Sequence, residues 1–194
     1  MSTEQQRADD RTDGALVLAL RDAGDAMAFA VLIKRHERPL YGFIARQLGH
    51  RTHARDLYQQ TLLQILDRID TCASPESFRP WAFSIASNLC RNFRRSQTQR
   101  AGERSLGEVS AIASRMPDPE EALANNQTAQ RIAAALAALP DAQREVFVLH
   151  HYSQLSYEEI ATATGVPLGT VKSRMNAALT QLRTLLSMLA EEQR

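Results

Sequence analysis

Apolar residues recur at helical spacing along most of the chain, and no segment alternates convincingly with the two-residue period of a β-strand. In the first half, the clearest amphipathic helix is expected over residues 53–69. The apolar stripe of this helix consists of Leu57, Thr61, Leu62, Ile65, Leu66 and Ile69. Its opposite face is long and polar but carries little charge. These patterns predict an all-α fold.

A second strong pattern covers residues 81–95, where every fourth position is apolar: Trp81, Ile85, Leu89 and Phe93. Shorter helices are expected over residues 15–23, 130–139 and 142–150. In the longer apolar pattern that precedes residue 49, Pro39 marks a helix start or a kink, because proline lacks the N–H that an inner helical turn uses.

Composition divides the chain into four parts. Residues 1–14 are charged and have no periodic apolar set, so a disordered tail is expected there. Residues 15–96 and 128–194 each hold several helical patterns and predict two small helical domains. Residues 97–127 are polar, contain scattered Gly and Pro, and are expected to form a flexible linker.

Within the second domain, residues 156–179 predict two short helices joined by a tight turn. Ser156 and Glu159 have the spacing of a capping box at the start of the first helix. Gly165 can adopt the left-handed conformation that ends it, and Pro167 can open the second helix, where its missing N–H has no cost.

The second of these helices has an apolar side made of Val171, Met175, Ala178 and Leu179. The other side presents Lys172, Ser173 and Asn176. A helix with such a polar face, held by a short turn, is suited to the major groove of DNA. An αα-hairpin inside a helical bundle needs the same apolar spacing and is the alternative.

The net charge of +1 averages unlike segments. Basic residues gather in residues 34–55 and again in residues 81–104, each with a single glutamate, and such patches can hold phosphates. The second patch also contains the chemistry used to bind single-stranded bases, namely aromatic rings, an amide and guanidinium groups. These groups belong to Trp81, Phe83, Asn88, Arg91 and Arg94. The alternative for the two aromatic residues is a place in the core.

Several other classes find little support. The sequence has no Gly-rich phosphate loop, no HExxH motif, and no Ser or Cys nucleophile next to a credible base, so no catalytic residue, metal or cofactor is expected. No apolar run approaches the roughly 18 residues that span a bilayer. Cys72 and Cys90 fit reduced thiols in the cytoplasm. A zinc site built from His50, His53 and one cysteine is a less favoured alternative.

Two motif groups resemble one known family, the extracytoplasmic-function (group 4) sigma factors of bacterial RNA polymerase. HARDLYQQTLLQIL at residues 53–66 and FRPWAFSIASNLCRNFRR at residues 78–95 are similar to sigma region 2. LSYEEIA at residues 155–161 and GTVKSR at residues 169–174 are similar to sigma region 4. The resemblance implies core RNA polymerase and promoter DNA as partners, a cytoplasmic location, and a role in a stress or environmental response.

The resemblance also implies site residues. The face toward the β′ clamp helices of polymerase consists of Asp56, Leu57, Gln59, Gln60 and Thr61. The −10 element is expected to contact Ser77, Phe78, Asn88, Arg91, Arg94 and Arg95. The −35 duplex is expected to contact Thr170, Lys172, Ser173, Arg174 and Asn176. The sequence departs from the usual family pattern at Tyr58, Gln60 and Ala177.

Region 4 contacts with the polymerase β flap and an anti-sigma factor partner are further implications. A stand-alone helix-turn-helix regulator is the alternative function. From residue 136 onward the chain has five Lys or Arg residues against six Asp or Glu residues. Such a domain is expected to bind DNA weakly unless it is tethered to polymerase, where its contact with DNA becomes effectively intramolecular.

Overall fold

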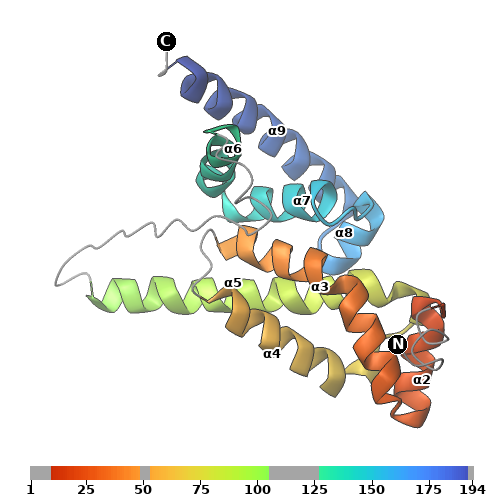
Figure 1. Cartoon of the computed structure of the whole chain (residues 1–194). Coiled ribbons are helices and arrows are strands. Elements are labelled where there is room, and N and C mark those ends of the chain that lie inside the picture. Colours follow the sequence, from red (N-terminus) through yellow and green to blue (C-terminus); the bar gives the residue numbers. More distant parts are fainter. Residues whose placement is uncertain (1–9, 49–52, 105–126, 192–194) are drawn as a thin grey trace.

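The computed structural model describes residues 10–48, 53–104 and 127–191, and the regular elements in these ranges are all helical (Figure 1). The first half contains α2 (Asp13–Ala23), α3 (Ala26–Leu48), α4 (Ala54–Asp67), the short 3-10 turns η1 (Ile69–Thr71) and η2 (Pro75–Ser77), and α5 (Phe78–Arg104). The second half contains α6 (Gln127–Ala138), α7 (Asp141–His151), α8 (Tyr157–Thr164) and α9 (Leu168–Glu191). The prediction of an all-α fold is confirmed.

The chain becomes helical earlier than the sequence pattern predicts. Helix α2 begins at Asp13 because the Thr12 hydroxyl accepts the Ala15 N–H at 3.2 Å and so caps the first turn. It ends at Gly24 in the left-handed conformation, with φ at 63°. The end of the expected 1–14 tail therefore belongs to a helix, and residues 1–9 lie outside the described residues.

Helix α3 contains Pro39 within its length. The helix continues on both sides of this residue, and its ribbon bends along its course (Figure 1). Proline removes one backbone hydrogen bond and its ring crowds the preceding turn, which is the usual cause of such a bend. The predicted helix start at this position is wrong, and the predicted kink describes the helix better.

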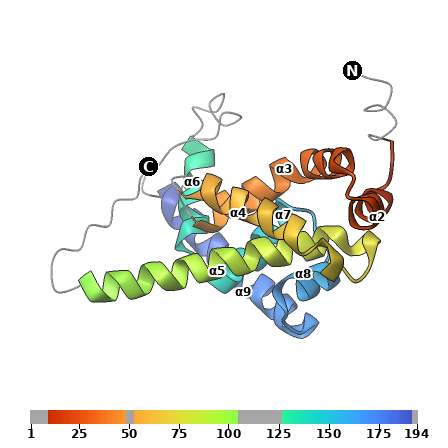
Figure 2. The ribbon, with the colours of Figure 1, turned by 90° about the horizontal axis from the view of Figure 1, so that it is seen from below.

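Helix α5 is the long element along which the molecule is built (Figure 2). It contacts α3 and α4 of its own half and α8 of the second half. Its last turns extend beyond the neighbouring helices (Figure 2). Residues 97–104, expected in the linker, are helical because they contain no proline and are mostly good helix formers. The remaining linker positions up to residue 126 lie outside the described residues.

The two halves share one apolar core. Phe43 and Phe83 pack edge to face at a centroid distance of 5.6 Å, and both belong to the same buried cluster as Leu149 and Ile160 of the second half. A smaller cluster joins α6 to α9 through Leu136, Leu139, Ala178 and Leu182. In this structure the halves are therefore packed together and not merely joined through the chain.

Across the described residues, no helix combines the length and the apolar composition that crossing a membrane requires. Cys72 and Cys90 are both free and buried, as the sequence indicated. His53 packs its ring on Phe93 at 4.9 Å, whereas His50 lies outside the described residues. Within the described ranges, no three His, Cys, Asp or Glu residues are placed to share a metal ion.

Candidate functional site

The helix-turn-helix of the second half has the predicted caps. The Ser156 hydroxyl accepts the Glu159 N–H at 3.1 Å, and the Glu159 carboxylate accepts the Ser156 N–H at 2.7 Å. This reciprocal capping box fixes the start of α8. Gly165 ends α8 with φ at 70°, and α9 begins directly after Pro167. The capping box and the left-handed glycine are confirmed.

Helix α9 separates its two faces as expected. Val171, Met175 and Ala178 are buried, whereas Lys172, Ser173 and Asn176 are exposed and Thr170 and Arg174 are half-buried. The Ser173 hydroxyl donates to the Thr170 carbonyl at 3.0 Å, which leaves its oxygen free to accept another hydrogen bond. The exposed side chains lie within two turns of one another and form a polar surface on the described part of α9.

The aromatic residues at the start of α5 do not form an exposed stacking surface. Phe78 is fully buried between His36 and Trp81, with centroid distances of 5.3 and 6.0 Å. Phe83 is also fully buried, and Trp81 is half-buried. The Phe78 ring completes the core in this arrangement, and its expected contact with the −10 element stays a prediction.

Polar residues predicted for the same interface lie on two sides of α5. Ser77, Asn88 and Arg95 are exposed. Arg91 is also exposed and Arg94 is half-buried, and both approach carboxylates of α7. The Nε atom of Arg91 lies 3.7 Å from Oε1 of Glu145, and Nη1 of Arg94 lies 2.5 Å from Oδ1 of Asp141. The sequence did not indicate this pairing.

Asp141 also bonds Arg144, a buried arginine one turn further along α7. Arg144 donates to the carbonyls of Leu136 and Ala137, which satisfies the carbonyl end of α6. Burial lowers the pKa of Arg144, and the nearby charge of Arg94 lowers it further. One carboxylate thus serves two guanidinium groups, one from each half of the molecule.

Helix α4 presents only part of its predicted partner-binding face. Asp56, Gln59 and Gln60 are exposed. Leu57 and Thr61 are buried, and the Thr61 hydroxyl donates to the Leu57 carbonyl at 2.7 Å, so both residues help to position the helix. Their expected contact with polymerase stays a prediction.

Two leucines add an apolar part to the exposed surface of α4. Leu66, expected in the buried stripe, is 46% exposed, and Leu63 is 67% exposed. The buried stripe follows the i, i+4, i+8 series of Leu57, Thr61 and Ile65, and Leu66 stands about 100° further around the helix. The exposed surface of α4 is therefore mixed, with amides, a carboxylate and leucines.

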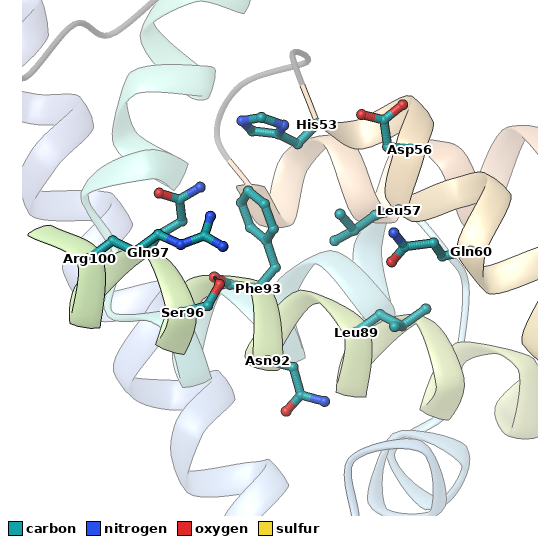
Figure 3. Close-up of a pocket in the computed structure, with 10 residues that line it drawn as sticks. All are labelled: His53, Asp56, Leu57, Gln60, Leu89, Asn92, Phe93, Ser96, Gln97 and Arg100. Carbon is teal, nitrogen blue, oxygen red and sulfur yellow. Dashed lines mark hydrogen bonds between the residues drawn. The ribbon is translucent and has the colours of Figure 1, made fainter.

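A hollow of about 440 Å³ lies between α4 and α5, next to this surface (Figure 3). Leu57, Leu89 and Phe93 form its apolar wall, and Asp56 and Gln60 stand at the α4 side. Ser96, Gln97 and Arg100 line the other end (Figure 3). The hollow extends the α4 surface onto α5 and can receive a side chain from a docked helix.

The fold and these surfaces define a DNA-binding protein in which a helix-turn-helix unit packs on a second helical unit. A family model for sigma-70 region 2 matches residues 32–100, and one for sigma-70 region 4 matches residues 129–182. The ECF RNA polymerase sigma factor RpoE of Cereibacter sphaeroides is 31% identical over 180 residues, which cover 92% of this chain and 97% of that protein.

Solved structures give the same result. The structure of CnrH in complex with the cytosolic domain of CnrY matches with a TM-score of 0.66 and 26% identity, over 91% of this chain and 97% of that one. RpoE in complex with the anti-sigma factor NepR from Bartonella quintana matches in fold with a TM-score of 0.68 and 24% identity, over 82% of this chain and 96% of that one.

The chain belongs to the ECF RNA polymerase sigma factors. It is an alternative sigma factor, a subunit that binds core RNA polymerase and directs it to promoters to start transcription, and it is not an enzyme. This assignment replaces the alternative of a stand-alone regulator, which has no use for the region 2 half.

Proposed function

We propose that three helices divide the work of promoter recognition. Helix α9 reads the −35 duplex through Thr170, Lys172, Ser173, Arg174 and Asn176. Helix α5 and the turn before it hold the −10 element through Ser77, Asn88, Arg91, Arg94 and Arg95. Helix α4 binds core polymerase through Asp56, Gln59 and Gln60, together with Leu63 and Leu66.

The observation that carries this proposal is the exposed polar face of α9 opposite its buried apolar side. Asn176 has the donor and acceptor pair that matches adenine in the major groove, and Lys172 can bind a guanine edge or a phosphate. The near-neutral charge of the second half supports a duplex-reading role that depends on tethering to polymerase.

Run-off transcription with core polymerase on a genomic library identifies a promoter, and matched variants then test each helix on it. We expect Lys172→Ala to cost about 1–3 kcal/mol of −35 discrimination. Arg183→Ala removes the same charge from an exposed position further along α9 and is the control. Equal loss in both variants would show that charge alone matters and would contradict groove reading by α9.

For the −10 element, the control lies one turn away on α5. Asn88 and Asn92 are both exposed asparagines. We expect Asn88→Ala to reduce open-complex formation by about tenfold, the effect of losing a hydrogen-bond pair, and Asn92→Ala to leave it unchanged. Arg91→Ala is expected to weaken holoenzyme binding to the melted −10 strand, and an unchanged affinity would contradict its assignment.

For polymerase binding, we expect Leu63→Lys to weaken the complex by about 1.5–3 kcal/mol, because a leucine that becomes buried in the interface is replaced by a charge. Asp56→Asn is compared with Asp67→Asn, another exposed aspartate on α4. Gel filtration with core polymerase and competition with a second sigma factor measure the loss. Full co-elution of both Leu63→Lys and Asp56→Asn would contradict this assignment.

We also propose a cytoplasmic location, where core polymerase works, and regulation by an anti-sigma factor. The two solved relatives support the second point, since RpoE was crystallised with an anti-sigma factor and CnrH with the cytosolic domain of CnrY. The exposed leucines of α4 give such a partner an apolar anchor. Competition between the partner and core polymerase for α4 is the expected outcome.

A further inference from the structure

Helix α2 lies at the end of the molecule where α5 begins (Figure 1, Figure 2). It contacts α3 and both short 3-10 turns, η1 and η2, which lead into α5. The last residue of η2 is Ser77, which is exposed and which we assign to the −10 element. Because η2 packs on α2, this helix stands behind the segment that we expect to meet the DNA.

The two elements come closest at Gly14, in the first turn of α2. Gly14 is buried, and a Cβ atom at this position would lie 3.1 Å from Oε1 of Glu76 and 3.5 Å from Cβ of Pro75. The first distance is shorter than an ordinary van der Waals contact, so a larger side chain would push against η2. The backbone of α2 approaches η2 this closely because the residue is glycine.

A second contact anchors Phe78, the residue that follows the turn. Phe78 is fully buried, and its ring packs against His36 of α3 at a centroid distance of 5.3 Å. Nε2 of His36 lies 2.5 Å from Oδ2 of Asp13 in α2, and Oδ1 of Asp13 accepts a hydrogen bond from Arg35 at 2.8 Å. The Asp13 carboxylate therefore fixes the imidazole ring, and the imidazole ring supports Phe78.

The turn is also ordered from within. The Ser74 carbonyl accepts hydrogen bonds from the Cys72 thiol at 3.3 Å and from the Ser77 N–H at 2.9 Å. The Ser74 hydroxyl donates to Oε2 of Glu76 at 2.8 Å. These local bonds set the shape of η2, whereas the contacts with α2 and α3 set its position. Each residue that is fixed before DNA binds spares the complex an ordering cost worth a factor of about 5–30 in affinity.

We propose that Asp13, Gly14 and His36 are positioning residues for the −10 element. They touch no base themselves and instead hold the turn Pro75–Ser77 in the place where it meets the DNA. A displaced turn loses discrimination between bases, whereas the phosphate contacts of α5 remain, because phosphate contacts carry no sequence information. The proposal rests on the assignment of this turn and of α5 to the −10 element.

The main test compares Gly14→Val with Ala15→Val in the full-length chain. Both variants place valine in the first turn of α2, but Ala15 is exposed. The readout is the rate of open-complex formation by holoenzyme on the identified promoter, divided by the rate on a promoter with one substituted −10 base. We expect Gly14→Val to lower this −10 ratio at least about fivefold, and Ala15→Val to leave it unchanged. The corresponding ratio for a substituted −35 base should stay constant in both variants.

Asp13→Asn and Asp22→Asn form a second pair on the same helix. Both carboxylates are paired with an arginine, but only Asp13 also holds the ring that supports the start of α5. We expect Asp13→Asn to lower the −10 ratio at least about twofold, because a neutral amide holds the imidazole less firmly than a carboxylate does. Asp22→Asn should leave the ratio unchanged.

A purely structural role would slow every promoter by the same factor, and an unchanged −10 ratio in Gly14→Val therefore overturns the proposal. If circular dichroism shows that Gly14→Val lowers the folded fraction, Gly14→Ala replaces it in the same comparison. The −10 assignment is judged separately by Ser77→Ala, Asn88→Ala and Arg91→Ala. If these three variants leave open-complex formation unchanged, the assignment fails and the proposal fails with it. If they impair it while the Gly14 variant keeps its ratio, only the positioning role is wrong.

Discussion

The two helices that we propose to contact promoter DNA have different surroundings. On α9 the polar side chains are exposed, and the neighbouring residues are nearly neutral in total charge. On α5 two of the arginines are already paired with carboxylates of α7. Because α9 lies in a half with almost no net charge, that half is expected to bind DNA weakly by itself. On the more basic helix α5, Arg94 is half-buried against Asp141, whereas Asn88, Arg91 and Arg95 stay exposed.

The largest expected effect concerns whether the halves fold as one unit. Met175 is buried in the core that both halves share, and Trp81 is the single tryptophan and lies in the first half. We expect Met175→Ala to lower the free energy of unfolding by about 2–5 kcal/mol. Urea unfolding followed by Trp81 fluorescence should shift together with the far-UV circular dichroism. A fluorescence transition that stays in place would show that the halves unfold independently.

The next effect is local to the contact between the halves. Arg79→Ala removes the guanidinium that bonds the Ser153 carbonyl and is expected to weaken the contact between the halves by about 1.5–3 kcal/mol, the usual value of a hydrogen bond to a charged group. The rate of alkylation of Cys90, which is buried in α5, measures this loss. Arg95→Ala, an exposed arginine on the same helix, is the control. Identical alkylation rates in the two variants would remove Arg79 from the contact.

A smaller effect is expected at the helix-turn-helix. Ser156→Ala removes one half of the capping box and should reduce stability by about 1 kcal/mol. Because α8 contacts α5, part of this loss should reach the Trp81 signal as well. Ser173→Ala, an exposed serine of α9, should change −35 binding without changing the unfolding midpoint. If Ser156→Ala instead changed −35 binding and left the unfolding midpoint unchanged, the cap would not contribute to stability.

The smallest expected effect on stability concerns Asp13, at the start of α2. Hydrogen bonds to His36 and Arg35 hold the pKa of Asp13 below its usual value of 3.8. The stabilisation is therefore present above that value and is lost as the pH falls through the lowered pKa. Because Asp13 is partly exposed, we expect Asp13→Asn to cost no more than about 1 kcal/mol at pH 7. Unfolding measured from pH 7 to pH 2 should show the difference vanish, while Cys90 protection stays unchanged.

The local features of the second half follow directly from the sequence. A capping box, a left-handed glycine and the two faces of α9 depend on residues within a few positions of one another, so spacing predicts them. The α-helical class follows for the same reason. The end of α5 is less predictable, since Gly102 lowers helix propensity without forcing a break.

The contact between the halves could not be predicted in this way. Ser87 and Glu145 are far apart in the sequence, and nothing near either residue indicates the other. Leu66 was misplaced because it stands at the edge of an apolar stripe, where packing and not periodicity decides burial.

Asp141 and Glu145 depend to different degrees on the contact between the halves, because Asp141 pairs with arginines of both halves. Asp141 keeps Arg144 as a partner after Arg94 leaves, so its surroundings change little. Glu145 loses the serine and the arginine that compensate it and must recruit water instead. Because the desolvation penalty of a buried ion pair can exceed its Coulombic gain, the Glu145 contact is expected to add little net stability to the packing of the halves.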